Sequence, residues 1–269
     1  MQTMKSFIIF DRKIIRKKIM TADKIIEQML ALGDEYQKQN LMRFFKTGEG
    51  EYGYGDEFIG LKVPVTRQFV KANKDLQREE IQKLIDSKYH EVRLCGFLIL
   101  VEQFDKLCKP KYDNDIKVIA ERDEIIRFYL ENSTKANNWD LVDMSAPKLV
   151  GKWMMLKSML SDDEKLEITD KLSESENLWQ QRISIVFTWT TSHYGKPEFA
   201  FRYAQKLISH KHDLIQKAVG WMLREAGKHN GLDVLREFLE DHHAKMSRTS
   251  LRYAIEHMEE KERKYWLLK

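Results

Sequence analysis

Apolar residues recur at helical spacing along most of this 269-residue chain. The first such segment spans residues 23–45 and carries the aliphatic residues Ile25, Ile26, Met29, Leu30 and Leu32. It predicts one helix or two. Beyond Asp75 the pattern continues as amphipathic helices separated by short polar turns, so the chain is expected to be all-α.

An internal repeat organises these helices. Five segments can be aligned, each early in a predicted helix and each followed by an aliphatic run, with the polar anchor residues Arg93, Asp143, Arg182, Gln216 and Arg252. Successive anchors are 50, 39, 34 and 36 residues apart. Because helix-pair repeats of about 34 to 47 residues are typical of solenoids, the spacing predicts a HEAT-like or armadillo-type α–α superhelix with a concave binding surface.

A glycine-rich acidic segment interrupts the helices near the amino terminus. Five of the twelve glycines lie between Gly48 and Gly60, among several carboxylates and before Pro64. The composition predicts a loop with a structural or lid-like role. It does not fit a phosphate-binding loop, because it lacks the GxxxxGK[ST] order and its acidity would repel phosphate.

The amino-acid composition narrows the fold class and the expected cellular location. Glycine and proline total 16 residues and 33% of the chain is charged, which suits long helices and excludes a turn-rich all-β fold. The two cysteines, Cys95 and Cys108, match neither a disulfide framework nor a CxxC zinc motif. Neither a membrane span nor a signal peptide is recognisable, so a cytoplasmic protein without a membrane partner is expected.

The net charge of +4 arises at the amino terminus. Residues 1–20 contain six cations and one anion, which leaves 40 cations and 41 anions in residues 21–269. We therefore expect a basic, poorly ordered leader over residues 1–20, to which no function is assigned, and a single HEAT-like repeat domain over residues 21–269. Nucleic-acid binding by this domain would depend on local clustering of cations.

The polar anchors have two interpretations. They could form hydrogen bonds between repeats, or they could line a mainly cationic groove with one anionic point at Asp143. Arg182 illustrates the choice, because its helix is among the most apolar in the chain and an unpaired buried guanidinium is costly. Its partner is expected to be Asp143, one repeat earlier, or a phosphate in the groove.

Two tryptophans stand beside polar residues. On a helical wheel, Trp221 shares an arc of about 60° with Lys217, Arg224 and Lys228, away from the aliphatic face of its helix. This position favours contact with a nucleotide; the alternative is coverage by the next repeat or cation–π contact with its own lysines.

The second tryptophan belongs to the segment 137–143. Asn138 is a favourable helix cap, so a helix is expected to begin there, and Trp139 and Asp143 would then share one face. Asp140 falls in the first turn, where a carboxylate stabilises the helix dipole. Asp140 is therefore interpreted as structural and Asp143 as the functional candidate.

Several of these motifs together resemble the AlkD family of DNA alkylation-repair glycosylases, over about residues 22–260. The resemblance lies in the segments Gly60–Pro64, Trp139–Asp143 with Ala146-Pro147, Leu178–Arg182, Ile215–Trp221 with Leu223–Glu225, and Arg252–His257. It implies an α-solenoid that removes N3- and N7-alkylated purines from duplex DNA without flipping the base into a pocket.

The resemblance also implies roles for individual residues. Asp143 would be the catalytic carboxylate, Trp139 and Trp221 the aromatic walls beside the damaged nucleotide, and Arg182 a contact to a backbone phosphate. No metal and no cofactor is implied, and the protein is expected to act as a monomer on alkylated double-stranded DNA. If DNA is the partner, further cations should converge on the concave face, namely Lys148, Lys211, Lys217, Arg248 and Arg252.

The sequence departs from the family pattern at four places. Asp213 and Leu214 replace two bulky aromatics before the Trp221 helix, Asn138 replaces a second tryptophan, and Phe44 stands in place of a tyrosine. The glycine-rich segment around residues 48–58 resembles an insertion. These changes bear on lesion range more than on the basic chemistry.

Two other functions fit the same pattern. One is a solenoid that binds branched or damaged DNA without cleaving a glycosidic bond; the retention of Asp143 with both tryptophans argues against it. The other is a protein-binding scaffold, which the balanced charge of residues 21–269 favours.

Overall fold

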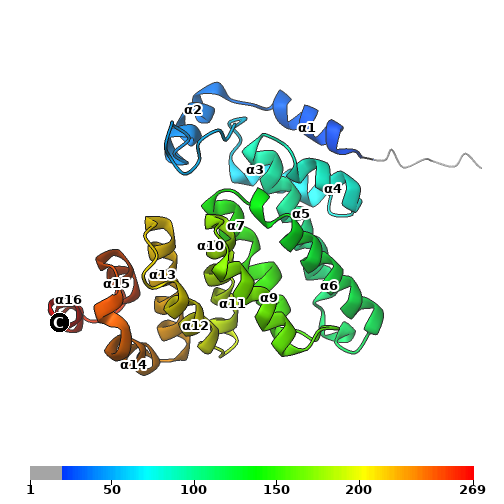
Figure 1. Ribbon diagram of the computed structural model, residues 1–269. Helices are drawn as coiled ribbons and strands as arrows, with labels where there is room; N and C mark the ends of the chain where they lie inside the picture. The colour runs from blue at the N-terminus through cyan, green and yellow to red at the C-terminus, as the bar shows by residue number, and fades with distance from the viewer. Residues whose placement is uncertain (1–19) are drawn as a thin grey trace, which may run out of the picture.

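The computed structural model describes residues 20–269, so the predicted leader, apart from Met20, lies outside the described part (Figure 1). The amino-terminal half contains α1 (Ala22–Ala31), α2 (Glu35–Phe44), α3 (Val63–Ala72), α4 (Arg78–Ile85), α5 (His90–Leu107), α6 (Ile116–Glu131) and α7 (Trp139–Ser145). A π-helical turn, η3 (Pro147–Gly151), is followed by α8 (Lys152–Met155), α9 (Asp162–Glu174), α10 (Leu178–Val186), α11 (Thr188–His193) and α12 (Glu198–Leu207). The chain ends with α13 (Asp213–Asn230), α14 (Leu232–His242), α15 (Arg248–Ala254) and α16 (Glu260–Leu268).

The repeat predicted from the sequence is present. Each of the five anchors is the fourth or fifth residue of its helix, in α5, α7, α10, α13 and α15 respectively. These helices contact one another in that order and form one layer, while α4, α9, α12 and α14 pack against it. The prediction of an all-α superhelix is thereby confirmed.

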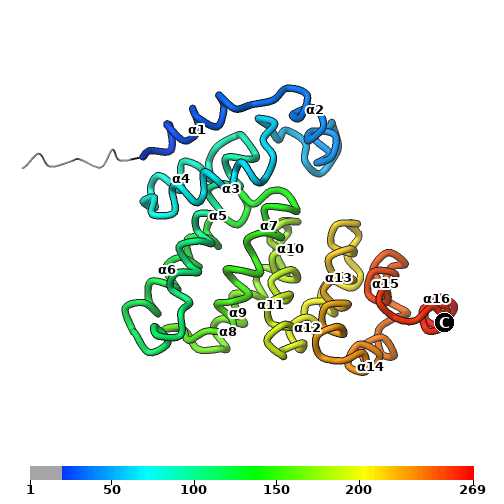
Figure 2. Tube along the Cα trace, turned by 180° about the vertical axis from the view of Figure 1, so that it is seen from behind, coloured from blue at the N-terminus to red at the C-terminus, as the bar shows by residue number. Residues whose placement is uncertain are grey.

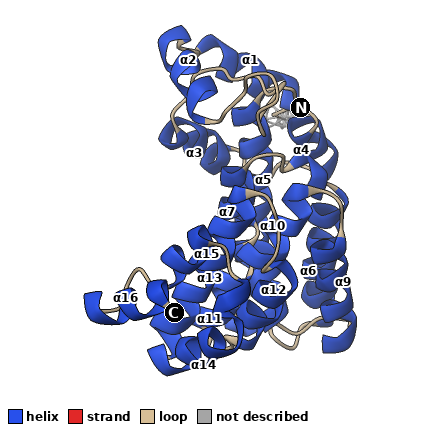
Figure 3. Ribbon diagram, turned by 60° about the vertical axis from the view of Figure 1, so that its left-hand side comes forward, coloured by secondary structure: helices blue, strands red, loops and turns tan. Residues whose placement is uncertain are grey.

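The stacked layers curve along their length. Figure 3 shows the ribbon bent into a C, with α2 and α3 at one end and α15 and α16 at the other. α6 and α9 lie on its outer side. Figure 2 shows the same arc from behind, with α1 to α4 at one end and α14 to α16 at the other.

The segment 23–45 forms two helices, as one of the two alternatives anticipated. Asp34 caps the second, because its carboxylate accepts a hydrogen bond from the Gln37 amide at 2.6 Å. The glycine-rich segment that follows is a loop, as expected. Its last part lies against the amino terminus of α5, where the Glu91 carboxylate accepts hydrogen bonds from the amides of residues 59–61 at 2.8 to 3.1 Å.

Close backbone contacts join consecutive helices of the repeat layer. α13 approaches α15 so closely that a Cβ added at Gly220 would lie 2.3 Å from the Ser250 carbonyl oxygen and 2.5 Å from the Tyr253 Cβ. Glycine is therefore required at this crossing. This close approach packs α15, which carries Arg252, against α13, which carries Trp221.

We expect Gly220→Ala to lower the free energy of unfolding by about 2 kcal/mol, because two helices would have to move apart. Urea denaturation followed by circular dichroism measures the change. Gly227→Ala, on the same helix, is the matched control, since the three atoms nearest to its Cβ would all belong to the Leu235 side chain, at 2.9 Å or more. Equal effects of the two substitutions would contradict the close approach at Gly220.

Both cysteines are free thiols, in keeping with the absence of a disulfide framework expected from their number. Within residues 20–269, none of the helices combines the length and the apolar composition needed to cross a bilayer.

Candidate functional site

Asp143 and Arg182 form a two-pronged ion pair between α7 and α10. The Arg182 Nε donates to Asp143 Oδ1 at 2.9 Å, and Arg182 Nη2 donates to Oδ2 at 2.8 Å. Arg182 Nη1 also donates to the Leu214 carbonyl oxygen at 2.6 Å, near the start of α13. The pair therefore links three successive helices of the repeat layer, and of the two partners expected for Arg182 the structure shows Asp143.

Local capping sets the positions of both residues. The Asn138 side chain accepts a hydrogen bond from the Trp139 amide at 2.9 Å, so α7 begins where the sequence predicted. Asn177 caps α10 in the same way, accepting from the Trp179 and Gln180 amides. Asp143 and Arg182 each follow their cap by five residues, which places them at equivalent heights in adjacent repeats.

The pair is largely withdrawn from water. The Asp143 side chain is 17% exposed and that of Arg182 is 6% exposed. Burial raises the pKa of Asp143 above its ordinary value, and the charge and hydrogen bonds of Arg182 oppose that rise. Asp143 is thus a partly accessible carboxylate in a poorly solvated setting.

An aromatic cluster surrounds Trp139. Its half-buried indole stacks on Phe45, with ring centroids 5.2 Å apart and planes at 24°, and Phe44 meets it edge-on at 5.8 Å. Phe44 is 62% exposed. Phe45 therefore holds the Trp139 ring in place, and Phe44 extends the aromatic surface from Trp139 to solvent.

The glycine-rich segment contributes Tyr52 to this cluster. The Tyr52 hydroxyl lies close enough to Trp139 for the two side chains to interact, and its ring meets Trp179 edge-on, with ring centroids 6.2 Å apart. Burial raises the pKa of Tyr52, and Lys217 on α13 lies within electrostatic reach of it. Tyr52 thus places a hydroxyl beside Trp139, next to the position where Phe44 departs from the family pattern.

A buried charge network lies beneath Trp139. His90 Nδ1 is 3.0 Å from Asp56 Oδ2, and its Nε2 is 2.9 Å from Asp140 Oδ2. Arg93 also pairs with Asp56. Burial by itself would lower the pKa of His90, but the two carboxylates outweigh it and raise the pKa to about 9. The Asp140 carboxylate faces this network, a position that agrees with the interpretation of Asp140 as structural.

Four of the polar anchors form hydrogen bonds within the protein: Arg93 bonds within its own repeat and to the loop, whereas Asp143, Arg182 and Gln216 bond between repeats. Arg93 donates to the carbonyl oxygens of Ser87 and Lys88 at 2.9 Å and pairs with Asp56, while Gln216 donates to carbonyls at the end of α12 and accepts from Ser247. Both are buried. The alternative of a mainly cationic groove built from the anchors is wrong for these two residues, because both side chains are buried. Of the five anchors, only Arg252 is exposed.

The cations around Trp221 are partly neutralised. Trp221 is half-buried and packs against the core. Lys217 pairs with Asp213 at 2.6 Å, and Arg224 pairs with Glu256 and lies 3.7 Å from Glu225. The helical wheel identified the arc that Trp221 shares with its neighbouring cations. It did not show the acids that face this arc, Asp213 on α13 itself and Glu256 after α15.

The remaining predicted backbone contacts differ in accessibility. Lys211, Arg248 and Arg252 are exposed, and Arg248 donates to the Leu267 carbonyl oxygen at 2.5 Å. Lys148, in η3, is half-buried, and burial together with the nearby Arg67 lowers its pKa. Lys217, Arg248 and Arg252 come from the contacting helices α13 and α15, whereas Lys148 lies two repeats away.

The sequence analysis did not find Tyr52, Phe45 or His90. The first two lie in or beside the loop, where helical periodicity gives no orientation. One set of side chains among the described residues could ligate a metal ion, namely His193, Glu225 and His229, and it lies on α11 and α13. The only sequence signal for it was the i, i+4 spacing of Glu225 and His229.

Comparison with known proteins gives a consistent result. A family model described as DNA alkylation repair enzyme matches residues 25–258. A solved structure described as a predicted DNA alkylation repair enzyme from Enterococcus faecalis is 14% identical, with a TM-score of 0.58, over 85% of this chain and 97% of that one. A second, smu.31 from Streptococcus mutans UA159, is 16% identical, with a TM-score of 0.49, over 88% of this chain and 98% of that one. A search of curated proteins found no match. At 14% identity the first structure supports the fold alone, whereas the family model spans most of the chain.

Proposed function

The chain belongs to the family of DNA alkylation repair enzymes, and from this premise we propose that it is a glycosylase that excises N3- and N7-alkylated purines from duplex DNA. The observation that carries the proposal is the Asp143 carboxylate, which is partly accessible, oriented by Arg182 and carried on the same helix face as Trp139. The family membership supports a role in alkylation repair, and the site supports the specific chemistry.

The chemistry requires one well-placed carboxylate. Alkylation at N3 or N7 leaves the purine positively charged, so it departs as a neutral base with little acid assistance. The difficult species is the oxocarbenium-like sugar left behind. Asp143 would stabilise that cation or orient the attacking water, and neither role needs a metal ion or cofactor.

Arg182 would position the carboxylate. Each Asp143 oxygen accepts one hydrogen bond from the guanidinium and keeps lone-pair capacity for another donor. Fixing both oxygens before the sugar charge develops avoids reorganisation during the reaction. The remaining donors of Arg182 could reach a backbone phosphate beside the lesion.

Trp139 and Trp221 would flank the damaged nucleotide. Aromatic faces attract a cationic base or sugar, and the stack of Trp139 on Phe45 keeps its ring in one orientation. The exposed edge of Phe44 would extend this wall towards the DNA.

The proposal is tested by incubating the purified protein with methylated duplex DNA and measuring free 7-methylguanine and 3-methyladenine by mass spectrometry. We expect release of at least one of them above the spontaneous rate. If the protein releases neither base faster than buffer alone does, the proposal is contradicted.

One observation favours a second candidate. The two-pronged pair with Arg182 also suits a purely structural Asp143, as in a solenoid that binds branched or damaged DNA without cleaving it. In that case DNA binding persists while base release is absent.

Five cations of the protein would contact the DNA backbone on the concave side, namely Lys148, Lys211, Lys217, Arg248 and Arg252. Arg252 serves as the test because, unlike the other four polar anchors, it is exposed. Arg252→Ala should make the slope of log binding constant against log salt concentration shallower by about 0.9, since one phosphate contact is lost.

Fluorescence anisotropy with a labelled duplex between 50 and 200 mM salt measures that slope. Lys171→Ala is the matched control, because Lys171 is an exposed cation on α9, where it pairs with Glu167 at 2.7 Å. Identical slopes for wild type and Arg252→Ala would place Arg252 outside the interface.

A further inference from the structure

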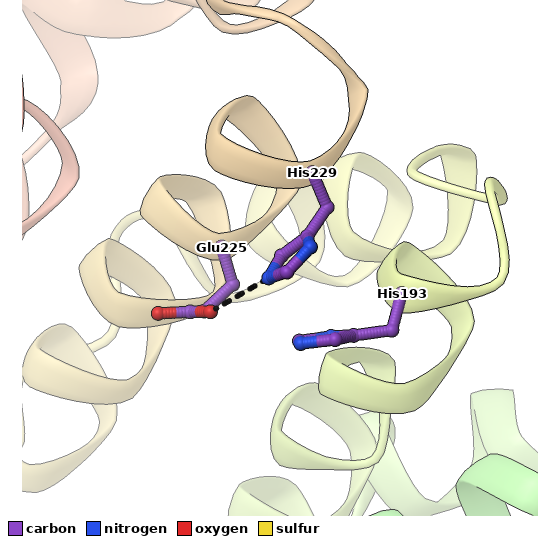
Figure 4. Close-up of side chains that lie close together, drawn as sticks. All are labelled: His193, Glu225 and His229. Carbon is purple, nitrogen blue, oxygen red and sulfur yellow. Dashed lines mark ion pairs between the residues drawn. The ribbon is translucent and has the colours of Figure 1, made fainter.

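We propose that His193, Glu225 and His229 form a binding site for a divalent transition-metal ion of the zinc type, which links α11 to α13. Figure 4 shows the three side chains converging from two helices. His193 ends α11, and Glu225 and His229 lie one turn apart on α13. The proposal stands independently of the repair activity.

The ligand atoms are already close to a coordinating arrangement. One nitrogen or oxygen from each side chain lies within 4.8 Å of the other two, and His229 Nε2 is 3.5 Å from Glu225 Oε2. In a tetrahedral zinc site, ligands about 2.0 to 2.2 Å from the metal lie about 3.3 to 3.6 Å from one another. The Glu225–His229 pair therefore has the required separation, and the ligand atom of His193 lies within 4.8 Å of both.

His193 is oriented as metal-binding histidines are. Its Nδ1 lies 2.7 Å from the Trp189 carbonyl oxygen, so Nδ1 carries the proton and donates it to that carbonyl. Nε2 is then left with a lone pair for a metal. The Trp189 and His229 rings pack against His193, with centroids 3.7 and 3.6 Å away, and hold the ring in place.

Glu225 supplies a buried negative charge that lacks a close partner. The residue is 6% exposed, and the nitrogen atoms that pair with its carboxylate are His229 Nε2 at 3.5 Å and Arg224 Nη2 at 3.7 Å. Both distances exceed those of good hydrogen bonds to a charged group. Arg224 is drawn towards Glu256 on the other side. A bound dication would give Glu225 the direct charge contact that its burial calls for.

The ligand set defines the class of metal. Two imidazoles with one carboxylate suit Zn²⁺ and its neighbours such as Co²⁺ and Ni²⁺, whereas Mg²⁺ and Ca²⁺ prefer oxygen ligands. Three protein ligands leave one position of a tetrahedral site for water.

The site lies beside the proposed aromatic wall. Glu225 and His229 follow Trp221 by four and eight residues on α13, which corresponds to about 6 and 12 Å along the helix axis. A metal bridge would fix this part of α13 against α11 of the preceding repeat.

The test is calorimetric titration of the full-length, untagged, chelator-treated protein with ZnCl₂. We expect saturable binding of one Zn²⁺ per chain, and at least tenfold weaker affinity in His193→Ala, His229→Ala and Glu225→Gln. His257→Ala is the matched control, because His257 is an exposed histidine after α15 and should leave the affinity unchanged. MgCl₂ should give no saturable heat.

Two further measurements keep the result decisive. Circular dichroism melting shows whether each variant is folded, and Zn²⁺ should raise the melting temperature of the wild type but not of folded ligand variants. One equivalent of Co²⁺ should give visible absorption bands of a nitrogen–oxygen site in the wild type. Absence of saturable Zn²⁺ binding, or equal affinity in the wild type and the folded histidine variants, would overturn the proposal.

Discussion

Asp143→Asn should slow the release of alkylated purines about a hundredfold while leaving the affinity for alkylated duplex DNA nearly unchanged. Asparagine keeps the shape of the side chain and one acceptor for Arg182, but it loses the negative charge that would stabilise the sugar cation. The effect therefore appears in the chemical step. Single-turnover assays at saturating protein separate this step from binding and product release.

The control for this substitution is Asp213→Asn. Asp213 is a half-exposed carboxylate at the start of α13, where it pairs with Lys217, and it has no proposed part in the reaction. Undiminished excision by Asp143→Asn would remove Asp143 from the catalytic role. Equal losses of excision rate in both variants would show that the rate depends on the general negative charge of the surface.

The pH profile provides a second readout for Asp143. Since burial raises the pKa of this carboxyl, the wild-type rate should fall on the acidic side at a pH above the ordinary value of about 3.9. The protonated, neutral acid cannot stabilise a cation. Asp143→Asn should lack this acidic limb.

The free energy of unfolding should fall by about 3 kcal/mol between pH 6.5 and 9 through the deprotonation of His90. The pKa of His90 is raised from 6.5 to about 9 in the folded protein. A raised pKa contributes stability that is fully present below the unfolded value and is lost as the pH passes the folded value. Deprotonation leaves Asp56 and Asp140 buried beside a neutral ring.

Urea denaturation at several pH values measures this loss. His90→Gln removes the titrating group, so the variant should be less stable at pH 6.5 and should lack the decline towards pH 9. His257→Ala, which replaces an exposed histidine, should retain the wild-type dependence. Parallel stability curves for the wild type and His90→Gln would show that the charge of His90 does not stabilise the fold.

The helical repeat could be predicted because its signals are local. Aliphatic spacing located the helices, and the alignment of five polar anchors placed Arg93 and Arg182 at equivalent heights in their helices, as the structure has them. Asn138 indicated where α7 begins, and the wheel then separated Asp143 from Asp140. The helix assignments used residues within about two helical turns of one another, and the alignment needed only the recurrence of such local patterns every 34 to 50 residues.

The surroundings of the site were not predictable in the same way. His90 meets Asp56 and Asp140 across 34 and 50 residues of sequence, and Tyr52 reaches Trp139 from an irregular loop. A helical wheel gives the direction of a side chain but not what faces it. For that reason the acids that neutralise Lys217 and Arg224 were missed, and Gln216 was not assigned to its carbonyl partners.

The most direct test of the account uses a defined duplex with a single N7-methylguanine, on which abasic-site formation and protein binding are measured in parallel. We expect the wild type to bind the duplex and convert the lesion to an abasic site that alkali cleaves, with 7-methylguanine released in equal amount. Tight binding without abasic sites above the spontaneous level would contradict the catalytic assignment and identify the protein as a DNA-binding solenoid.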